Sequence, residues 1–355
     1  MPEKVLVAMS GGVDSTVSAL LLENLGYECI GANMRLFSNE DAGISSYKSC
    51  CSLDDVQDAR AAAFRLGMRF YVFNMTDDFS KTVIDDFVSE YEKGRTPNPC
   101  ILCNRYFKFG KLSGKAKMLG ASYTATGHYA CIEKCGDEFF LRRGKDRNKD
   151  QSYVLYFMDQ KMLSQTLFPL GDLTKQQVRE LASDAGLLNA RKKESQDICF
   201  VPDGNIRDAL IRLSHYTPCS GVFTDRNGYV IGTHSGAAAY TVGQRRGTGI
   251  SSDRRLYVIK KNIADNSVVL GPEEDLYSRS FDITDVSLTG MEKFIHDIHC
   301  TVMIRYNSRE YDAVISPTGD NTAHVCASVG IRAVTPGQAC VFYNGEYVLG
   351  GGIIK

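Results

Sequence analysis

The residues Ser10-Gly11-Gly12-Val13-Asp14-Ser15 join an apolar strand expected over residues 4–9 to a helical run over residues 15–25. The two glycines permit positive φ, which turns backbone N–H groups toward a bound anion. The helix that begins at the end of this stretch adds unpaired N–H groups and the positive end of its dipole. No Gly-Lys-Ser/Thr follows, so this is not the Walker loop that grips β- and γ-phosphates with a lysine. The junction therefore predicts a phosphate-binding loop of another kind.

The first 130 residues alternate between expected strands and helices. Strands are expected over residues 4–9, 28–34, 69–75 and 122–126. Helices are expected over residues 15–25 and from an N-cap at Ser52 to Gly67. Two more are expected, one from the end of strand 69–75 to about Tyr91 and one over residues 103–119. The strands are short and apolar on both faces, which is typical of a parallel sheet covered by helices. Ligands of such sheets bind beyond the carboxyl ends of the strands, where both Ser10–Ser15 and Thr126-Gly127-His128 fall.

The rest of the chain changes character after about residue 215. Residues 150–215 read as mostly helical, with Thr174 capping a helix that ends at Gly186. Residues 229–271 and 298–354 read as all-β, and Asn344-Gly345 is a hairpin signal. The fold predicted is α/β: a nucleotide-binding domain with a helical extension over 1–210, a small β-rich central domain over 211–278 and a C-terminal β-barrel over 279–355.

Composition favours a cytoplasmic enzyme. Hydrophobic residues make up 43% and charged residues 23% of the 355 residues, as in ordinary globular proteins. No apolar run approaches the roughly twenty residues that span a bilayer. The N-terminus leads straight into the first strand, without a charged and apolar leader. In that compartment the 12 cysteines are expected to be thiols, metal ligands or catalytic groups, not a disulfide framework.

Charge is unevenly distributed although the net charge is only −1. Between Asn98 and Ile132 there is no acidic residue. The bases of two neighbouring stretches are Arg105, Lys108, Lys111, Lys115, Lys117, Arg142, Arg143, Lys145, Arg147 and Lys149. Acids gather instead over residues 77–92. This segregation predicts a basic face for a polyanion such as nucleic acid, while a solvated helix face explains Lys108 to Lys117 equally well.

Three cysteines are candidates for chemistry. Cys100 and Cys103 form a Cys-x-x-Cys in the loop that leads into the basic helix, and Cys199 follows Lys192 and Lys193. A thiol at a helix N-terminus among basic side chains is expected to be partly thiolate at neutral pH. A Cys-x-x-Cys is also half of a zinc site, but a second pair with the usual spacing is missing. Buried apolar packing accounts for Cys29, Cys326 and Cys340, and Cys50 and Cys51 are assigned no function.

Two resemblances follow from these motifs. Ser-Gly-Gly-x-Asp-Ser resembles the signature of the PP-loop ATP pyrophosphatases, which implies cleavage of ATP between its α- and β-phosphates. The whole chain is similar to the bacterial tRNA-specific 2-thiouridylase (MnmA) family. The residues that carry this second resemblance are Gly94–Asn104, Ala125–Tyr129, Asn148–Tyr153, Asp197–Phe200, Tyr240–Gly247, Thr335–Gln338 and Gly350–Ile354.

The family resemblance implies a reaction and a set of site residues. The C2 oxygen of the wobble uridine of a tRNA is adenylated and replaced by sulfur, with release of AMP and pyrophosphate. The residues implied for ATP are Ala8, Met9, Ser10, Gly11, Gly12, Val13, Asp14, Ser15, Met34 and Gly127, with Asp14 also a contact for Mg²⁺. Cys199 would carry the sulfur as a persulfide. Cys103 would release it, leaving a Cys103–Cys199 disulfide for a reductant to reopen.

The same resemblance implies contacts with RNA and with a sulfur source. The target base would meet Asn98, Pro99 and Cys100. The rest of the tRNA would meet His128, Lys149, Asp150, Gln151, Arg305, Tyr306 and Gln338. A cysteine desulfurase or a relay protein would supply sulfur to the enzyme, which is expected to be a monomer. The expected substrates are the tRNAs for lysine, glutamate and glutamine.

Alternatives remain at this point. Many family members have aspartate where this chain has Cys100, so Cys100, Cys103 and Cys199 are also compatible with an iron–sulfur cluster that binds sulfide at an open iron. Other PP-loop enzymes adenylate small molecules and transfer nitrogen to them. A non-catalytic tRNA-binding or sulfur-carrier protein, and a zinc-ribbon module, are further possibilities.

Overall fold

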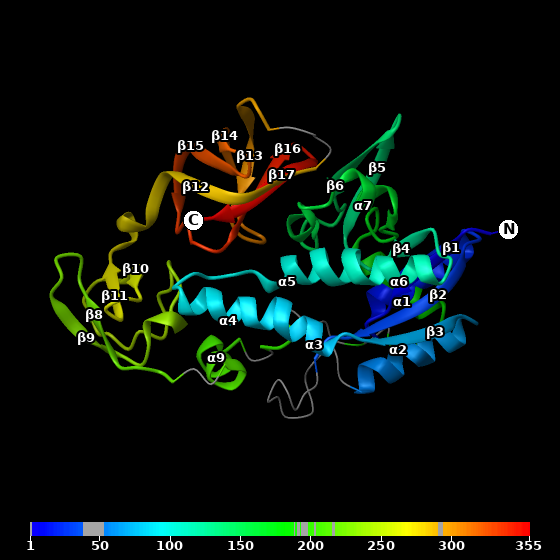
Figure 1. Cartoon of the computed structure of the whole chain (residues 1–355), viewed down its shortest axis with the longest axis horizontal. Helices are drawn as coiled ribbons and strands as arrows, with labels where there is room; N and C mark the ends of the chain where they lie inside the picture. Colours follow the sequence, from blue (N-terminus) through cyan, green and yellow to red (C-terminus); the bar gives the residue numbers. More distant parts are fainter. Residues whose placement is uncertain are drawn as a thin grey trace.

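The computed structural model describes residues 2–37, 53–187, 189, 192, 198–201, 204–214, 217–289 and 294–355. Figure 1 shows three parts: a parallel sheet with its helices at the N-terminal end, a small β part at the other end, and a β-barrel above the helices that lie between them. The predicted α/β fold with two β-rich parts is confirmed. The expected helix start at Ser52, and Cys50 and Cys51, lie outside the described residues. Within the described ranges, no helix has the length and apolar character that crossing a membrane requires.

The N-terminal sheet is parallel throughout and has the strand order β3-β2-β1-β4-β7. Its strands are β1 (Lys4–Ala8), β2 (Glu28–Arg35), β3 (Arg69–Asn74), β4 (Tyr123–Ala125) and β7 (Thr166–Leu167). Helices α1 (Val13–Asn24) and α2 (Leu53–Arg65) cover one face, where Ala19 and Ala63 pack against Val5 and Val7. Helix α6 (Leu112–Met118) covers the other face through Leu112.

Two expectations for this sheet need correction. The short strand β7 was not predicted, because two residues carry no periodicity. Strand β3 is not buried on both faces, since Tyr71 and Val72 are 36% and 39% exposed. It lies at the edge of the sheet, where only β2 pairs with it. An edge strand keeps one side in solvent, which its sequence does not reveal.

The helical layer contains the Cys-x-x-Cys pair. One run consists of α3 (Thr76–Phe79), the π-helical turns η1 (Ser80–Ile84) and α4 (Asp85–Glu92), and a second of α5 (Pro99–Leu102), the π-helical turns η2 (Cys103–Lys111) and α6. The second run starts at Pro99, not at residue 103. Asn98 caps it by accepting the Cys100 N–H at 3.2 Å, and a proline at the first helical position is preset for the helix. The Cys-x-x-Cys therefore lies inside a helix and not in the preceding loop.

The remaining helices are short. Between residues 150 and 215 the described ones are η3 (Ser152–Leu155), α7 (Gln160–Ser164), α8 (Lys175–Asp184) and α9 (Ile206–Ser214). The predicted cap of α8 is confirmed: Thr174 and Gln177 form a reciprocal capping box, and Gly186 follows with φ of 62°. Among the described residues of 150–215, helix is thus broken by turns and by β7, so the expectation of a mostly helical segment was too simple.

The two β-rich parts have separate sheets. The central one has the order β10-β11-β8-β9, with strands β8 (Gly221–Thr224), β9 (Val230–His234), β10 (Tyr257–Asn262) and β11 (Ser267–Gly271) and the short helix η4 (Ala237–Ala239). After η5 (Glu273–Leu276) the barrel strands are β12 (Tyr277–Leu288), β13 (Ile298–Met303), β14 (Tyr311–Gly319), β15 (Thr322–Arg332), β16 (Ala339–Asn344) and β17 (Tyr347–Ile354). The barrel closes because β12 pairs with both β15 and β17. The hairpin predicted at Asn344-Gly345 joins β16 to β17 and is confirmed.

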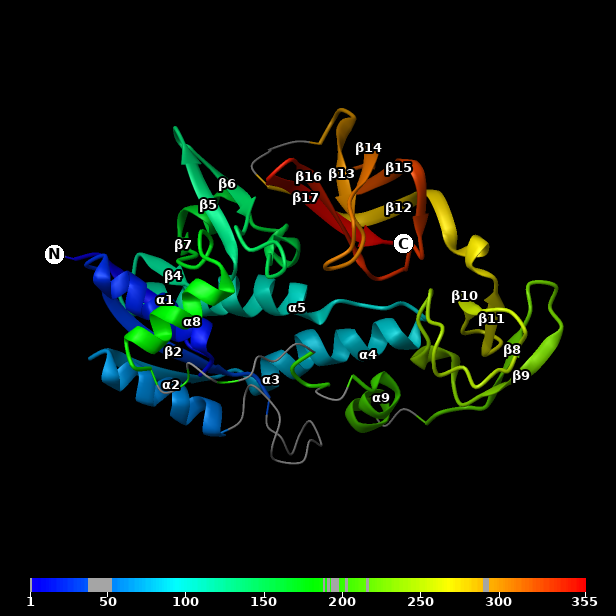
Figure 2. The ribbon, with the colours of Figure 1, turned by 180° about the vertical axis from the view of Figure 1, so that it is seen from behind.

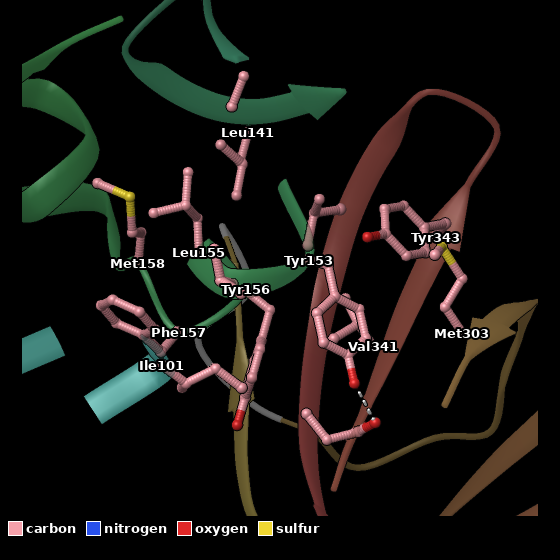
Figure 3. Close-up of a cluster of buried hydrophobic side chains, with 14 of the residues drawn as sticks. Ile101, Leu141, Tyr153, Leu155, Tyr156, Phe157, Met158, Met303, Val341 and Tyr343 are labelled. Atoms are coloured by element: carbon pink, nitrogen blue, oxygen red, sulfur yellow. Dashed lines mark hydrogen bonds between the residues drawn. The ribbon is translucent and has the colours of Figure 1, made fainter. Parts of the chain in front are cut away.

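An unpredicted hairpin ties the N-terminal part to the barrel. Strands β5 (Ala130–Cys135) and β6 (Glu138–Arg143) pair with each other, and β6 continues the barrel sheet beside β17. Beneath the hairpin, Figure 3 shows side chains of both parts in one apolar cluster. Ile101 of α5 belongs to this cluster, and Tyr153 donates a hydrogen bond to the Ala339 carbonyl of β16 at 2.7 Å. The Cys-x-x-Cys helix thus shares its core with the barrel.

Candidate active site

The phosphate loop is held in shape by its own hydroxyl groups. Gly11 has φ of 78°, and a Cβ there would lie 2.4 Å from the Asp55 carbonyl oxygen, so only glycine fits. The Ser10 N–H donates to Ser15 Oγ at 3.2 Å, and the Ser15 hydroxyl donates to the Gly12 carbonyl at 3.1 Å. Gly12 precedes α1 without a side-chain cap. The N-terminal end of α1 therefore lies directly at the loop.

Two buried asparagines brace the loop from other segments. Asn33 of β2 donates to the Met9 carbonyl at 2.9 Å. Asn189 donates to the Gly11 carbonyl at 3.3 Å and to Thr16 Oγ1 at 2.8 Å. Sequence reasoning missed both residues, because a single asparagine carries no local signal of its partner, which is 24 positions away for Asn33 and 178 positions away for Asn189.

The loop after β4 meets the phosphate loop, as expected for the carboxyl ends of neighbouring parallel strands. A Cβ on Gly127 would lie 3.0 Å from the Asp14 carbonyl carbon and from the Ser15 nitrogen, so the two backbones touch. Tyr129, two residues further on, donates from its hydroxyl to Asp14 Oδ1 at 2.9 Å. Lys175 of α8 donates to both carboxylate oxygens of Asp14 at 2.7 and 2.8 Å. Tyr129 and Lys175 were not among the predicted site residues.

A pocket of about 360 Å³ lies over these loops. The residues expected at ATP that line it are Ala8, Met9, Ser10, Asp14, Ser15, Met34 and Gly127. The residues expected at the base, the tRNA or the sulfur that line it are Pro99, Cys100, Cys103, His128, Gln151 and Cys199. The structure thus gathers members of both predicted groups around one space. Gly11, Gly12 and Val13 do not line it; Val13 is buried in the packing of α1.

The three candidate thiols differ in their surroundings. Cys100 is exposed near the start of α5, and Cys103 is half-buried at the start of η2. Cys199 is half-buried in the short described segment 198–201. Cys103 and Cys199 both pack against an apolar cluster that includes Phe79, and neither is in a disulfide. The π-helical start at Cys103 is a geometry that often occurs at functional sites.

The described residues contain no group of three Cys, His, Asp or Glu side chains close enough to hold one metal ion. Cys100, Cys103 and Cys199 therefore line the pocket without forming a ready three-thiolate set in this conformation. Asp14, expected at Mg²⁺, has both carboxylate oxygens engaged by Lys175. As it stands, this pair does not fit a dedicated protein site for Mg²⁺.

His128 is buried in the wall of the pocket. Burial, with a smaller contribution from the nearby Lys108 charge, holds the pKa of His128 well below its usual value of 6.5. Lys108 Nζ lies 3.3 Å from Nε2, and Thr126 Oγ1 lies 2.6 Å from Nδ1. Because an ammonium can only donate, Nε2 accepts from Lys108 and the Nδ1–H donates to Thr126. The imidazole is thus neutral in a single tautomer.

Several residues expected to contact tRNA form hydrogen bonds or ion pairs within the protein. Arg305 donates to the carbonyls of Val242 and Ala333 and to the Thr335 hydroxyl, which links the barrel to the central part. Gln338 donates to the Thr96 carbonyl at 2.8 Å. Asp150 is buried, accepts the N–H groups of Gly144 and Ser152, and lies 3.6 Å from the Arg143 guanidinium.

The other expected RNA contacts lie at different places. Asn98 caps α5, and its neighbours Pro99 and Cys100 line the pocket. Asp150 and Tyr306 line a second cavity of about 660 Å³ between β6 and the barrel, together with Arg147 and Asn148. Lys149 lies in the same loop and is half-buried.

The expected basic face is partly neutralised in space. Arg105 pairs with Asp285 of the barrel at 3.0 Å, and Arg142 pairs with Asp172 at 3.1 Å. Lys111 pairs with Asp78 of α3, and Arg147 with Glu346 at the β16–β17 turn. The charge segregation along the sequence was therefore misleading at these positions, because folding brings acids from distant segments beside the bases.

The loop, the parallel sheet, the central β sheet and the C-terminal barrel define an ATP-using enzyme of the PP-loop class with two appended β-rich parts. Family models match in the same order: the "tRNA methyl transferase HUP domain" over residues 3–203, the "tRNA methyl transferase PRC-barrel domain" over 213–272 and the "Aminomethyltransferase beta-barrel domain" over 278–354. The chain belongs to the tRNA-specific 2-thiouridylase (MnmA) family, whose members are tRNA sulfurtransferases.

Full-length relatives support this assignment. The "tRNA-specific 2-thiouridylase MnmA" of Halothermothrix orenii is 46% identical over 354 residues, 99% of each chain. The protein of the same name from Caldicellulosiruptor saccharolyticus is 46% identical over 358 residues, 100% of this chain and 99% of its own. A solved "4-thiouridine synthetase - RNA complex with bound ATP" is 18% identical, with a TM-score of 0.37 over 59% of this chain and 50% of that one. That overlap is too low to support any argument about the site.

Proposed function

We propose that this enzyme replaces the C2 oxygen of the wobble uridine of tRNA with sulfur, through adenylation and a cysteine persulfide. The observation that carries the proposal is that the phosphate loop and the thiols Cys100, Cys103 and Cys199 line a single pocket. A nucleotide bound at the loop would have its phosphates in the same pocket as the sulfur atoms. A synthetase acting on a small molecule has no need of these thiols, and the full-length relatives are named as tRNA enzymes.

The first step makes the uridine oxygen a leaving group. The C2 oxygen attacks the α-phosphorus of ATP, a C2–O–P bond forms, and the bond to pyrophosphate breaks. A urea-like carbonyl is a poor electrophile, so this activation is needed before sulfur can attack. The loop N–H groups and the positive end of α1 stabilise the charge that develops on the departing pyrophosphate. Mg²⁺ would enter with the phosphates of ATP and neutralise part of their charge, while the Asp14 carboxylate stays paired with Lys175.

The second step delivers sulfur from one cysteine and frees it with another. The outer sulfur of a Cys199 persulfide attacks C2, AMP leaves, and the base is joined to Cys199 through a disulfide. The Cys103 thiolate then attacks the Cys199 sulfur, the S–S bond to the base breaks, and 2-thiouridine is released. The resulting Cys103–Cys199 disulfide takes two electrons from a thiol reductant before the next cycle. The common packing of Cys103 and Cys199 against one apolar cluster supports this pairing.

The pocket wall suits a base taken out of the anticodon loop. Single-stranded bases can be unstacked and read on their edges. Asn98, Pro99 and Cys100 are the proposed contacts of the target uridine, while His128 and Gln151 stand at the same pocket. Lys149 and Tyr306 are proposed to contact the surrounding tRNA beside the second cavity. We further propose a monomer, tRNAs for lysine, glutamate and glutamine as substrates, and a cysteine desulfurase or relay protein as sulfur donor.

Nucleoside mass spectrometry tests the proposal. Purified enzyme, tRNA, ATP and a persulfide-generating sulfur source should yield 2-thiouridine, with one AMP formed per thiolated base. ATP turnover to AMP that proceeds equally well without tRNA would contradict it. Anaerobic purification with iron and acid-labile sulfide analysis separates the two sulfur routes. Stoichiometric iron that disappears in Cys100→Ser would replace the persulfide route with a cluster.

A further inference from the structure

A lysine stands behind the phosphate loop although the loop has none of its own. Lys175 is the first residue of α8, and its Nζ lies 2.7 and 2.8 Å from the carboxylate oxygens of Asp14 in the first turn of α1. The Lys175 side chain is only 10% exposed, and that of Asp14 is 30% exposed. Nothing in the local sequence marks this lysine, since 161 positions separate the two residues.

Several contacts fix the Lys175 ammonium in place. Its backbone N–H donates to Asp146 at 3.0 Å, which anchors the start of α8. Figure 2 shows α8 beside α1, and Val178 of α8 packs in one cluster with Val13 and Val17 of α1. The ring of Tyr129 lies 5.9 Å from the ammonium, and its hydroxyl donates to the same carboxylate.

The order of the groups decides what Lys175 can do. Asp14 lines the pocket, whereas Lys175 is not among the residues that line it. The carboxylate therefore stands between the pocket and the ammonium, and Lys175 acts through Asp14. An uncompensated carboxylate beside a triphosphate would repel it strongly, because little water screens charges in a partly buried site.

We propose that Lys175 is a positioning residue for the phosphate site: it neutralises Asp14 and, with Tyr129, fixes the direction of its carboxylate. The buried pair lets a carboxylate sit at the phosphate loop without excluding the polyphosphate. The proposal deepens the proposed function, since it takes ATP as the ligand of the loop. Binding measurements keep the two separate, because they need neither tRNA nor sulfur.

The test compares charge variants of Lys175 and Asp14. Calorimetry measures how tightly each binds Mg²⁺–α,β-methylene-ATP, which cannot be cleaved between the α- and β-phosphates. Lys175→Met should weaken binding about tenfold or more, because Asp14 keeps its charge. Asp14→Asn combined with Lys175→Met should bind at least about threefold more tightly than Lys175→Met alone. A double variant as weak as Lys175→Met would mean that Lys175 contacts phosphate directly, and would overturn the proposal. So would a Lys175→Met protein that binds like the wild type.

Two further variants keep the result interpretable. Lys161→Met removes an exposed lysine of α7 and should leave binding unchanged. Tyr129→Phe keeps both charges and removes one hydrogen bond to Asp14, so it gives an answer even where Lys175→Met does not fold. It should weaken binding about two- to threefold, and unchanged binding would remove the positioning role. If the expected binding pattern appears while the wild type makes no 2-thiouridine, the proposed function fails and this inference stands.

Discussion

The two ends of the pocket are built in different ways. At the nucleotide end, the loop Ser10–Ser15 is shaped by its own hydroxyls and closed by Gly127, both at the carboxyl ends of strands in one sheet. At the sulfur end, Cys103 lies on a helix whose flanks are held by the barrel. The Thr96 N–H donates to the Pro336 carbonyl at 2.8 Å, Thr96 accepts from Gln338, and Arg105 pairs with Asp285.

This difference indicates how the two halves of the reaction are organised. The contacts that hold the nucleotide end all come from the N-terminal part of the chain, so changes there should impair ATP binding and leave the barrel intact. The position of the thiols depends on contacts between separate parts of the chain. Substitutions in the barrel should therefore shift the Cys-x-x-Cys helix even where the substituted residues do not line the pocket.

The largest expected effect is at the sulfur end. Cys199→Ser and Cys103→Ser should each lower 2-thiouridine formation by about a thousandfold or more, because a hydroxyl cannot carry or attack a persulfide. Nucleoside mass spectrometry measures the product, and tRNA binding should persist. Cys326 was expected to be buried, but the structure places it on the exposed face of β15. Cys326→Ser is therefore the matched control and should thiolate normally. Normal thiolation by either pocket variant would show that its assigned role is wrong.

The next effect is at the nucleotide end. Gly127→Ala places a Cβ 3.0 Å from the Asp14 carbonyl carbon and the Ser15 nitrogen, so one of two tight backbones must shift. Binding of α,β-methylene-ATP should weaken about tenfold or more. Gly114→Ala is the control, since a Cβ there meets nothing within 4 Å. It lies inside α6 and should stabilise the protein by about 0.5–1 kcal/mol. Equal ATP binding by both variants would contradict the close contact.

A third comparison separates RNA contact from internal packing. Arg305→Met removes three hydrogen bonds, of which the one to the Val242 carbonyl joins the barrel to the central part, and should destabilise the protein by about 2–3 kcal/mol, seen as a lower Tm. Lys149→Glu should change stability by less than about 0.5 kcal/mol, yet weaken tRNA binding and reduce its salt slope by about one. A reversed pattern, in which the Arg305 variant alters the salt slope at unchanged Tm, would identify Arg305 as an RNA contact and not as a packing residue.

The smallest effect concerns pH and His128. An unfolded histidine titrates near pH 6.5, whereas burial and Lys108 keep the folded pKa well below that value. Below about pH 6.5 the unfolded chain binds a proton that the folded chain does not, so stability falls as pH falls, by at most about 1.4 kcal/mol per pH unit. His128→Asn should remove this part of the acid sensitivity in denaturant titrations. His299 is exposed, so His299→Gln should keep the acid sensitivity of the wild type. The same dependence of stability on pH in the wild type, His128→Asn and His299→Gln would contradict a buried neutral imidazole.

Sequence patterns predicted much of the fold but not the residues that hold the phosphate loop in place. Alternating strands and helices, the Thr174 cap and the Asn344-Gly345 hairpin are visible because each rests on neighbouring residues. The start of the helix at Pro99 was also marked locally, by an asparagine cap and a proline, although it was placed four residues too late. Lys175, Asn33 and Asn189 were not found, since their partners at the loop are distant in sequence.

The sequence by itself determined that a glycine-rich phosphate loop follows the first strand, because positive φ and free N–H groups depend on residue type at adjacent positions. It also determined that the candidate thiols stand in two separate motifs. Only the tertiary structure decided that these thiols and the loop line one pocket, that Asp14 is paired with Lys175, and that Arg305 and Gln338 join parts of the protein. Those facts depend on how distant segments pack, and long-range packing leaves no periodic trace in the chain.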